Sequence, residues 1–77
     1  MYLIELSQTD VRYQIAERLR DCRYYSGMTN KEIAQKVDVS EQTASGWFSK
    51  NDPHLPDVIT LRKLADLFGK KLDDLVP

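Results

Sequence analysis

Apolar residues recur at helical spacing in two short runs within residues 29–50. Spacings of three and four residues place apolar side chains on one face of a helix. The pattern therefore predicts a helix that starts near Asn30, a tight turn at residues 38–40, and a second helix from Glu41 to about Phe48. The two inward faces comprise Ile33, Ala34, Val37, Ala44, Trp47 and Phe48.

Polar residues mark the ends of these two helices. Thr29 and Glu32 have the spacing of a capping box, in which each side chain bonds the backbone N–H of the other residue. Asp38 tolerates the left-handed backbone that such a turn usually needs, and Ser40 can cap the second helix. The small Ala34 lets two helices joined by about three residues approach closely. This layout is typical of a helix-turn-helix that reads DNA.

Helical periodicity continues toward the N-terminus. The apolar stripe there predicts a helix from about Gln8 or Asp10 to Tyr24, with Ser7 or Thr9 as its cap. This stripe comprises Val11, Ile15, Leu19 and Cys22.

Beyond the motif, residues 49–57 are rich in Pro, Asn and Asp and predict a loop. Asp57 is suited to cap a fourth helix, which Gly69 ends, and Leu72 with Leu75 suggests a short fifth helix. The inward residues expected in the fourth helix are Val58, Leu61, Leu64, Ala65 and Phe68.

In order and spacing, these segments resemble the Cro/CI-type, or XRE-like, helix-turn-helix family. The motif TNKEIAQKVDVSEQTASGWFSK carries the resemblance, with LRDCRYYSGMT before it and LPDVITLRKLADLFGKKLDDL after it. The resemblance covers roughly residues 12–76. It implies an all-α fold, a compact five-helix lambda-repressor-like DNA-binding domain, with residues 1–77 as one domain and the helix-turn-helix at about residues 29–49. It also implies a phage or mobile-element repressor, or an antitoxin-like autoregulator.

Three residues depart from the family pattern. Asp38 stands where a glycine commonly makes the turn. Phe48 stands where many members carry a glutamate that pairs with the arginine closing the first helix, here Arg23. Without that ion pair, Arg23 can stack on Phe48 or Trp47, or reach a phosphate. Gly46 costs the second helix about 1 kcal/mol relative to Ala, and we expect it to leave room for a base edge or a thymine methyl.

Composition narrows the class of protein. A chain of 77 residues buries only about 60% of its unfolded surface, so its own stability is modest. Because Cys22 is the single cysteine, no internal disulfide can form, which fits a reducing cytoplasm. We expect Cys22 to act as a small apolar residue of the core. No apolar run is long enough for a membrane span or a secretory signal, so we expect a cytoplasmic protein. With one His and one Cys, we expect His54 to be an exposed residue without a role, and no metal site.

The net charge of −1 offers no global attraction to DNA. Residues 18–50 nevertheless carry six bases and four acids, whereas both flanks are acidic. The N–H groups at the start of the helix near Asn30 also suit a phosphate. The phosphate-binding candidates are Arg23, Asn30, Lys31, Lys50 and Asn51.

The outward face of the second motif helix supplies the base-reading candidates. Gln42 is the best of them, because a carboxamide can bond bidentately to N6 and N7 of adenine. Glu41 could accept from cytosine N4 or simply complement the helix dipole. Thr43, Ser45 and Gly46 complete the set.

Some apolar residues have no place in this scheme: Ile59 and Leu67 of the fourth helix, and the run from Tyr2 to Leu6. We expect a homodimer through helices four and five, with Ile59, Leu67, Leu72 and Leu75 in the interface. A two-fold contact would set two recognition helices about one DNA turn apart. The alternative is that these residues complete a small core. In the dimer, we expect the N-terminal run either to pack on helix one or to add a strand.

The sequence as a whole predicts a double-stranded DNA-binding transcriptional regulator that occludes a promoter at a palindromic operator. It contains no set of catalytic residues, so we expect no enzyme activity, no cofactor and no small-molecule ligand. The alternative is a protein–protein interaction module that keeps the fold without specific DNA binding. A fragment of a larger regulator is a further possibility, although Met1 and the terminal Pro77 favour a complete chain.

Overall fold

A computed structural model describes the backbone of residues 2–77 and the side chains of residues 11–77. Helices are the regular elements throughout this part of the chain, and no strand occurs in it. The expected all-α fold with five helices is confirmed. The helices are α1 (Tyr2–Ser26), α2 (Asn30–Val37), α3 (Glu41–Trp47), α4 (Val58–Leu67) and α5 (Leu72–Leu75).

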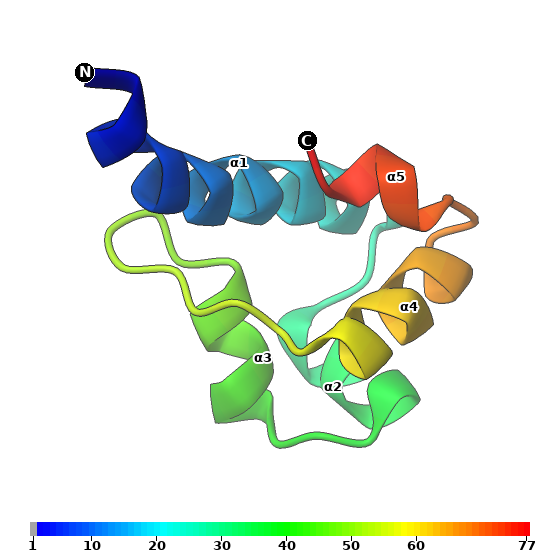
Figure 1. The fold of residues 1–77 in the computed structure, drawn as a ribbon. Helices are drawn as coiled ribbons and strands as arrows, with labels where there is room; N and C mark the ends of the chain where they lie inside the picture. Colours follow the sequence, from blue (N-terminus) through cyan, green and yellow to red (C-terminus); the bar gives the residue numbers. More distant parts are fainter. Residues whose placement is uncertain (1) are drawn as a thin grey trace.

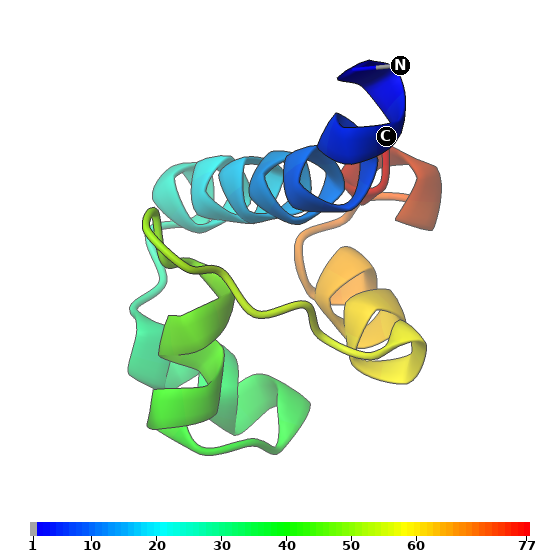
Figure 2. The same ribbon diagram turned by 60° about the vertical axis from the view of Figure 1, so that its left-hand side comes forward.

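The long helix α1 and the short α5 lie together across the top of the molecule in Figure 1, and α2 and α3 lie below them. Helix α4 packs against both α2 and α5, so it joins the two levels. Figure 2 shows the same arrangement from a second direction, with the start of α3 far from both chain ends. The helix-turn-helix is therefore held at one end of the domain and leaves α3 open on its outer side.

Helix α1 starts at Tyr2, so the expected start near Gln8 or Asp10 is wrong and neither Ser7 nor Thr9 caps it. Ser and Thr favour cap positions, but inside a helix each costs only about 0.5 kcal/mol relative to Ala. The backbone of the Tyr2–Leu6 run is helical, so the strand considered for it is wrong as well. The side chains of this run lie outside the described residues.

The caps predicted for the two motif helices form as expected. The Glu32 N–H donates to Thr29 Oγ1 at 3.1 Å, and the Thr29 N–H donates to Glu32 Oε1 at 2.9 Å. Asp38 ends α2 in the left-handed region, with φ 62° and ψ 50°. Ser40 Oγ accepts from the Thr43 N–H at 3.1 Å. These local hydrogen bonds set the start of both motif helices and the turn between them.

One continuous core joins the five helices. The inward stripes of α2 and α3 are buried, together with Ile15 and Leu19 of α1, and Leu61, Leu64 and Ala65 of α4. Val58 is 64% exposed, so its expected inward position is wrong. It is the first residue of α4, and the buried residues nearest to it in the sequence are Pro56 and Leu61.

Cys22 is half-buried and packs against this core. Burial raises the pKa of its thiol, while nearby Lys70 acts in the opposite direction. The uncharged thiol is therefore favoured, in keeping with the small apolar role expected for this residue.

Candidate nucleic-acid interface

Helix α3 is anchored through one face and open on the other. Ala44 and Trp47 are buried, and so is the capping residue Phe48. The exposed residues of the helix are Glu41, Gln42, Thr43 and Ser45. The Thr43 hydroxyl accepts a hydrogen bond from the Ser40 hydroxyl at 2.8 Å. The polar side chains of Glu41, Gln42 and Ser45 are exposed and available to a partner. Four of the five base-reading candidates thus share one exposed surface.

Gly46, the fifth candidate, is not open to solvent in the same way, because His54 of the loop before α4 lies against it. A Cβ placed on Gly46 would lie 3.3 Å from Cδ2 of the His54 imidazole, and the His54 N–H donates to the Gly46 carbonyl at 3.0 Å. The expected room for a base edge at Gly46 is therefore wrong, because the loop before α4 fills it with His54. Gln42 and Thr43 border this contact, and an open depression of about 460 Å³ lies between α3, His54 and Leu55.

Arg23 stacks on Phe48, which is one of the arrangements expected from the sequence. The guanidinium carbon lies 4.7 Å from the centre of the Phe48 ring. One guanidinium nitrogen also donates to Asn30 Oδ1. Two phosphate candidates therefore bond each other across the junction of α1 and α2. The remaining candidates, Lys31 and Lys50 with Asn51, are exposed.

The loop that follows α3 is bonded to helix α1. The Tyr13 hydroxyl donates to the Asn51 carbonyl at 2.6 Å, and Arg12 Nη1 donates to the Pro53 carbonyl at 3.3 Å. Farther along α1, Arg20 Nη1 donates to the Ser49 carbonyl at 3.2 Å. These contacts hold the loop beside the end of α3, with the Lys50 side chain facing solvent.

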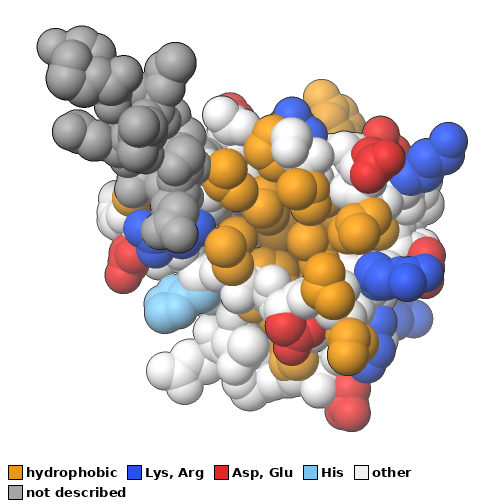
Figure 3. Space-filling view, in the orientation of Figure 1, with side chains coloured by type: hydrophobic (Ala, Val, Ile, Leu, Met, Phe, Trp, Pro, Cys, Tyr) orange, Lys and Arg blue, Asp and Glu red, His pale blue; other side chains and the backbone are white. Residues whose placement is uncertain are grey.

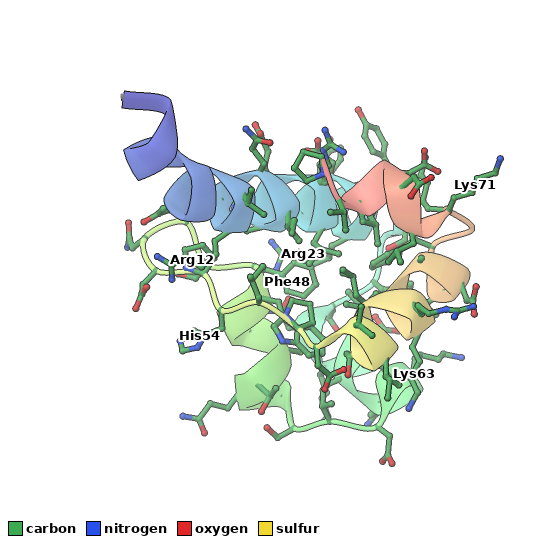
Figure 4. All side chains as sticks on the ribbon, viewed as in Figure 1. Arg12, Arg23, Phe48, His54, Lys63 and Lys71 are labelled. Atoms are coloured by element: carbon green, nitrogen blue, oxygen red, sulfur yellow. The ribbon has the colours of Figure 1, made fainter. Side chains whose placement is uncertain are left out.

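The charges on this loop partly cancel. Arg12 of α1 pairs with Asp52 at 3.5 Å, and their side chains are 37% and 79% exposed. Such a pair contributes little to stability, but it offsets an acidic charge beside Lys50. In Figure 4, Arg12 and His54 lie close to this loop at one end of the molecule, and Lys71 lies at the opposite end.

The residues expected in a dimer interface are not equivalent. Ile59 is 67% exposed, with exposed Leu55 and Val58 nearby in the chain. Leu67 and Leu72 are half-buried against the core. Leu75 is 1% exposed, so its expected role in an interface is wrong. The short α5 turns that residue inward, where it meets the core shared with α1 and α4.

Two other kinds of site find no support in the described part of the chain. No three His, Cys, Asp or Glu side chains among residues 11–77 come together in a way that could hold a metal ion. Within residues 2–77, the helices are too short or too polar to cross a membrane.

Sequence reasoning missed the contact between His54 and Gly46. The glycine in the middle of α3 was its only signal, since a helix carries such a residue at a cost unless something needs the space. Nothing in the pattern of residues 49–57 indicates which side chain fills that space.

Comparison with known proteins supports the assignment of residues 29–49 as a helix-turn-helix. Residues 14–75 match the helix-turn-helix family HTH_3. The chain is 32% identical over 62 residues to the HTH-type transcriptional regulator ImmR of Bacillus subtilis (strain 168). That alignment covers 80% of this chain and 47% of ImmR, so the chain spans about half the length of that relative.

Among solved structures, the crystal structure of CoII HppE in complex with Tris buffer is similar, with a TM-score of 0.74 and 22% identity. The match covers 87% of this chain and 37% of that chain, and it indicates a shared fold alone. The family match spans most of the chain and contains the complete α2–turn–α3 unit. The chain therefore belongs to the XRE-type helix-turn-helix family of DNA-binding transcriptional regulators.

Proposed function

We propose that this protein binds a specific double-stranded DNA operator by inserting α3 into the major groove, and that it represses transcription by occluding a promoter. The observation that carries this proposal is that Glu41, Gln42, Thr43 and Ser45 are all exposed on a helix whose other face is buried. In a helix-turn-helix, the first residues of the second helix contact base edges. Gln42 is the residue best suited to an adenine, through its carboxamide.

Phosphate contacts are proposed for Lys31 at the start of α2, and for Lys50 and Asn51 in the loop after α3. All three are exposed on elements that adjoin α3. Arg23 and Asn30 are proposed to act as a bonded pair, in which Arg23 orients Asn30 at the start of α2. Since phosphate contacts supply affinity and base contacts supply sequence preference, the two groups have separable effects.

We also propose that the protein binds DNA as a homodimer, with Ile59 and the neighbouring Val58 in the interface. These are among the large apolar side chains most exposed on the described surface. Figure 3 shows apolar side chains gathered on the face of the molecule seen in Figure 1. A two-fold axis would pair two copies of α3 and give a palindromic operator. A role as a phage or mobile-element repressor, or as an antitoxin-like autoregulator, fits such a domain.

The experiment that tests this function is selection of bound duplexes from a randomised pool by the purified chain, at two salt concentrations. Enrichment of a palindrome, with affinity falling steeply as salt rises, would support an operator-reading dimer. Enrichment of a single half-site would support DNA reading and contradict the dimer.

The exposed apolar residues Leu55, Val58 and Ile59 favour a second candidate, a protein–protein interaction module. The chain's net charge of −1 agrees with it. Failure of the chain to retain any duplex at low salt would support this candidate and contradict DNA reading.

A further inference from the structure

We propose that His54 is a DNA-contact residue, and that its imidazole binds a backbone phosphate at the edge of the groove occupied by α3. The inference rests on the proposed function, because it concerns the same DNA. It adds to the interface a further residue of the loop between α3 and α4, beside Lys50 and Asn51. His54 lies eight positions after Gly46 in the chain.

The structure holds this imidazole against the recognition helix. The His54 N–H donates to the Gly46 carbonyl at 3.0 Å, and Cδ2 of the ring lies 3.3 Å from the position that a Cβ on residue 46 would take. Because Gly46 has no side chain, the loop can approach α3 this closely. The ring nevertheless remains exposed at the surface, as Figures 3 and 4 show.

The position of the ring along α3 favours a phosphate over a base. Gly46 follows Gln42 by four residues, so the two lie one above the other on the same side of the helix. The start of a recognition helix reaches the base edges. A side chain that lies one turn farther along is nearer to the rim of the groove, where the phosphates run.

Hydrogen bonds from helix α1 hold the loop in place before any DNA is bound. Tyr13 and Arg12 bond the carbonyls of Asn51 and Pro53, the latter being the residue directly before His54. A loop that is already ordered loses less conformational entropy when it binds. The loop therefore presents His54 in a defined place before DNA arrives.

The charges around His54 favour a phosphate as its partner. The residues that line the depression with it, from Gln42 and Thr43 to Trp47 and Leu55, carry no charge. The charged side chains that face this loop from α1 are those of Arg12 and Arg20, and Arg20 bonds the Ser49 carbonyl. Within the loop, Asp52 pairs with Arg12 and Asp57 caps α4. Lys50 adds a positive charge to the same loop.

The chemistry gives this contact a pH dependence. A neutral imidazole has one N–H donor, whereas a protonated imidazole has two donors and a positive charge. A phosphate binds the protonated form more strongly. DNA binding should therefore be accompanied by proton uptake, and affinity should rise as the pH falls from 8 to 6.

The test compares the full chain with His54→Gln on the duplex most enriched from a randomised pool. Fluorescence anisotropy titrations are run at pH 6, 7 and 8 and at two salt concentrations. Because His54 is the only histidine, the variant removes the imidazole and leaves all other ionisable groups in place. Lys71→Gln is the matched control, since it alters one exposed charged residue at the opposite end of the molecule.

We expect the wild-type chain to bind about fivefold more tightly at pH 6 than at pH 8, and His54→Gln to bind almost equally at both. At pH 6, the salt dependence of His54→Gln should be shallower by about 0.9 per bound chain, the value for one phosphate contact. Lys71→Gln should keep both the pH dependence and the salt dependence of the wild type.

Two results would overturn the inference while leaving the proposed function intact. One is tight, sequence-specific binding by the wild type that does not change between pH 6 and 8. The other is a pH dependence that persists in His54→Gln. If the wild type retains no duplex at any pH or salt concentration, the proposed function fails, and the His54 contact fails with it.

Discussion

The guanidinium of Arg23 lies over the ring of Phe48, 4.7 Å from its centre, and so joins the last turn of α1 to the end of α3. The same guanidinium donates to Asn30 Oδ1 at the start of α2. Three helices therefore meet at one side chain. This cation–π contact holds the arginine against the core without burying a carboxylate.

The first prediction concerns this contact. In a double-mutant cycle of Arg23→Met and Phe48→Leu, we expect a coupling energy of about 1 kcal/mol, because Phe48 is buried and Arg23 is half-buried. The free energy of unfolding is measured by urea denaturation of the wild type and the three variants. Strict additivity of the two single changes would contradict the contact.

A second prediction concerns the turn between α2 and α3. Asp38 has φ 62°, a backbone conformation that costs most residues strain and glycine almost none. Asp38→Gly should therefore raise the free energy of unfolding by about 0.5–1 kcal/mol. Gln35→Gly is the control, since it places a glycine inside α2 and should lower stability by about 1 kcal/mol. Destabilisation by both changes would mean that the turn is not strained.

The cap of α4 should make stability depend on pH. The Thr60 N–H donates to Asp57 Oδ1 at 2.7 Å, and this hydrogen bond lowers the pKa of the Asp57 carboxyl. Because the pKa is lower in the folded state than in the unfolded state, the contribution is complete above the unfolded pKa and is lost as pH falls through the folded pKa.

Asp57→Ala should therefore melt at a lower temperature than the wild type at pH 7, and the difference should shrink in acid. Asp57→Asn keeps a capping oxygen without the charge, so it should retain most of the stability and lose that acid sensitivity. Thermal denaturation followed by circular dichroism from pH 7 to pH 2 measures both. A constant gap between Asp57→Ala and the wild type over this range would argue against a charged cap.

Base contacts and phosphate contacts should respond differently to substitution. Gln42→Ala should lose about 1–3 kcal/mol of discrimination at one base pair of the operator, because the carboxamide contacts an adenine. Lys50→Ala should weaken binding to all duplexes alike and reduce the salt slope by about 0.9. Titration of each variant against operator duplexes with single base changes distinguishes these effects. An unchanged base preference in Gln42→Ala would support the protein-interaction alternative.

The exposed apolar residues of α4 give the last prediction. Ile59→Lys should shift a dimer toward monomer without loss of fold, because the side chain is exposed. Leu75→Ala should instead destabilise the domain by about 2–5 kcal/mol, because it leaves a cavity in the core. Sedimentation velocity over a range of concentrations, with and without operator duplex, measures the first effect. A wild type that stays monomeric under all these conditions would exclude the homodimer.

Except for the start of α1, those features that depend on neighbours in the chain were predictable from the sequence. The capping box of Thr29 and Glu32, and the caps at Ser40 and Asp57, join residues three positions apart. The left-handed turn at Asp38 is equally local. Apolar spacing likewise predicted which face of α2 and α3 would be buried, because the period of the helix alone decides it.

The tertiary structure alone decided how distant segments share the space around α3. The sequence left open whether Arg23 stacks on Phe48, and it did not indicate that His54 covers Gly46 or that Tyr13 bonds the loop at Asn51. The burial of Leu75 depends in the same way on where α5 meets α1 and α4. These contacts join residues that have no fixed spacing in the chain, so their geometry follows from the packing of the whole domain and not from the period of any one helix.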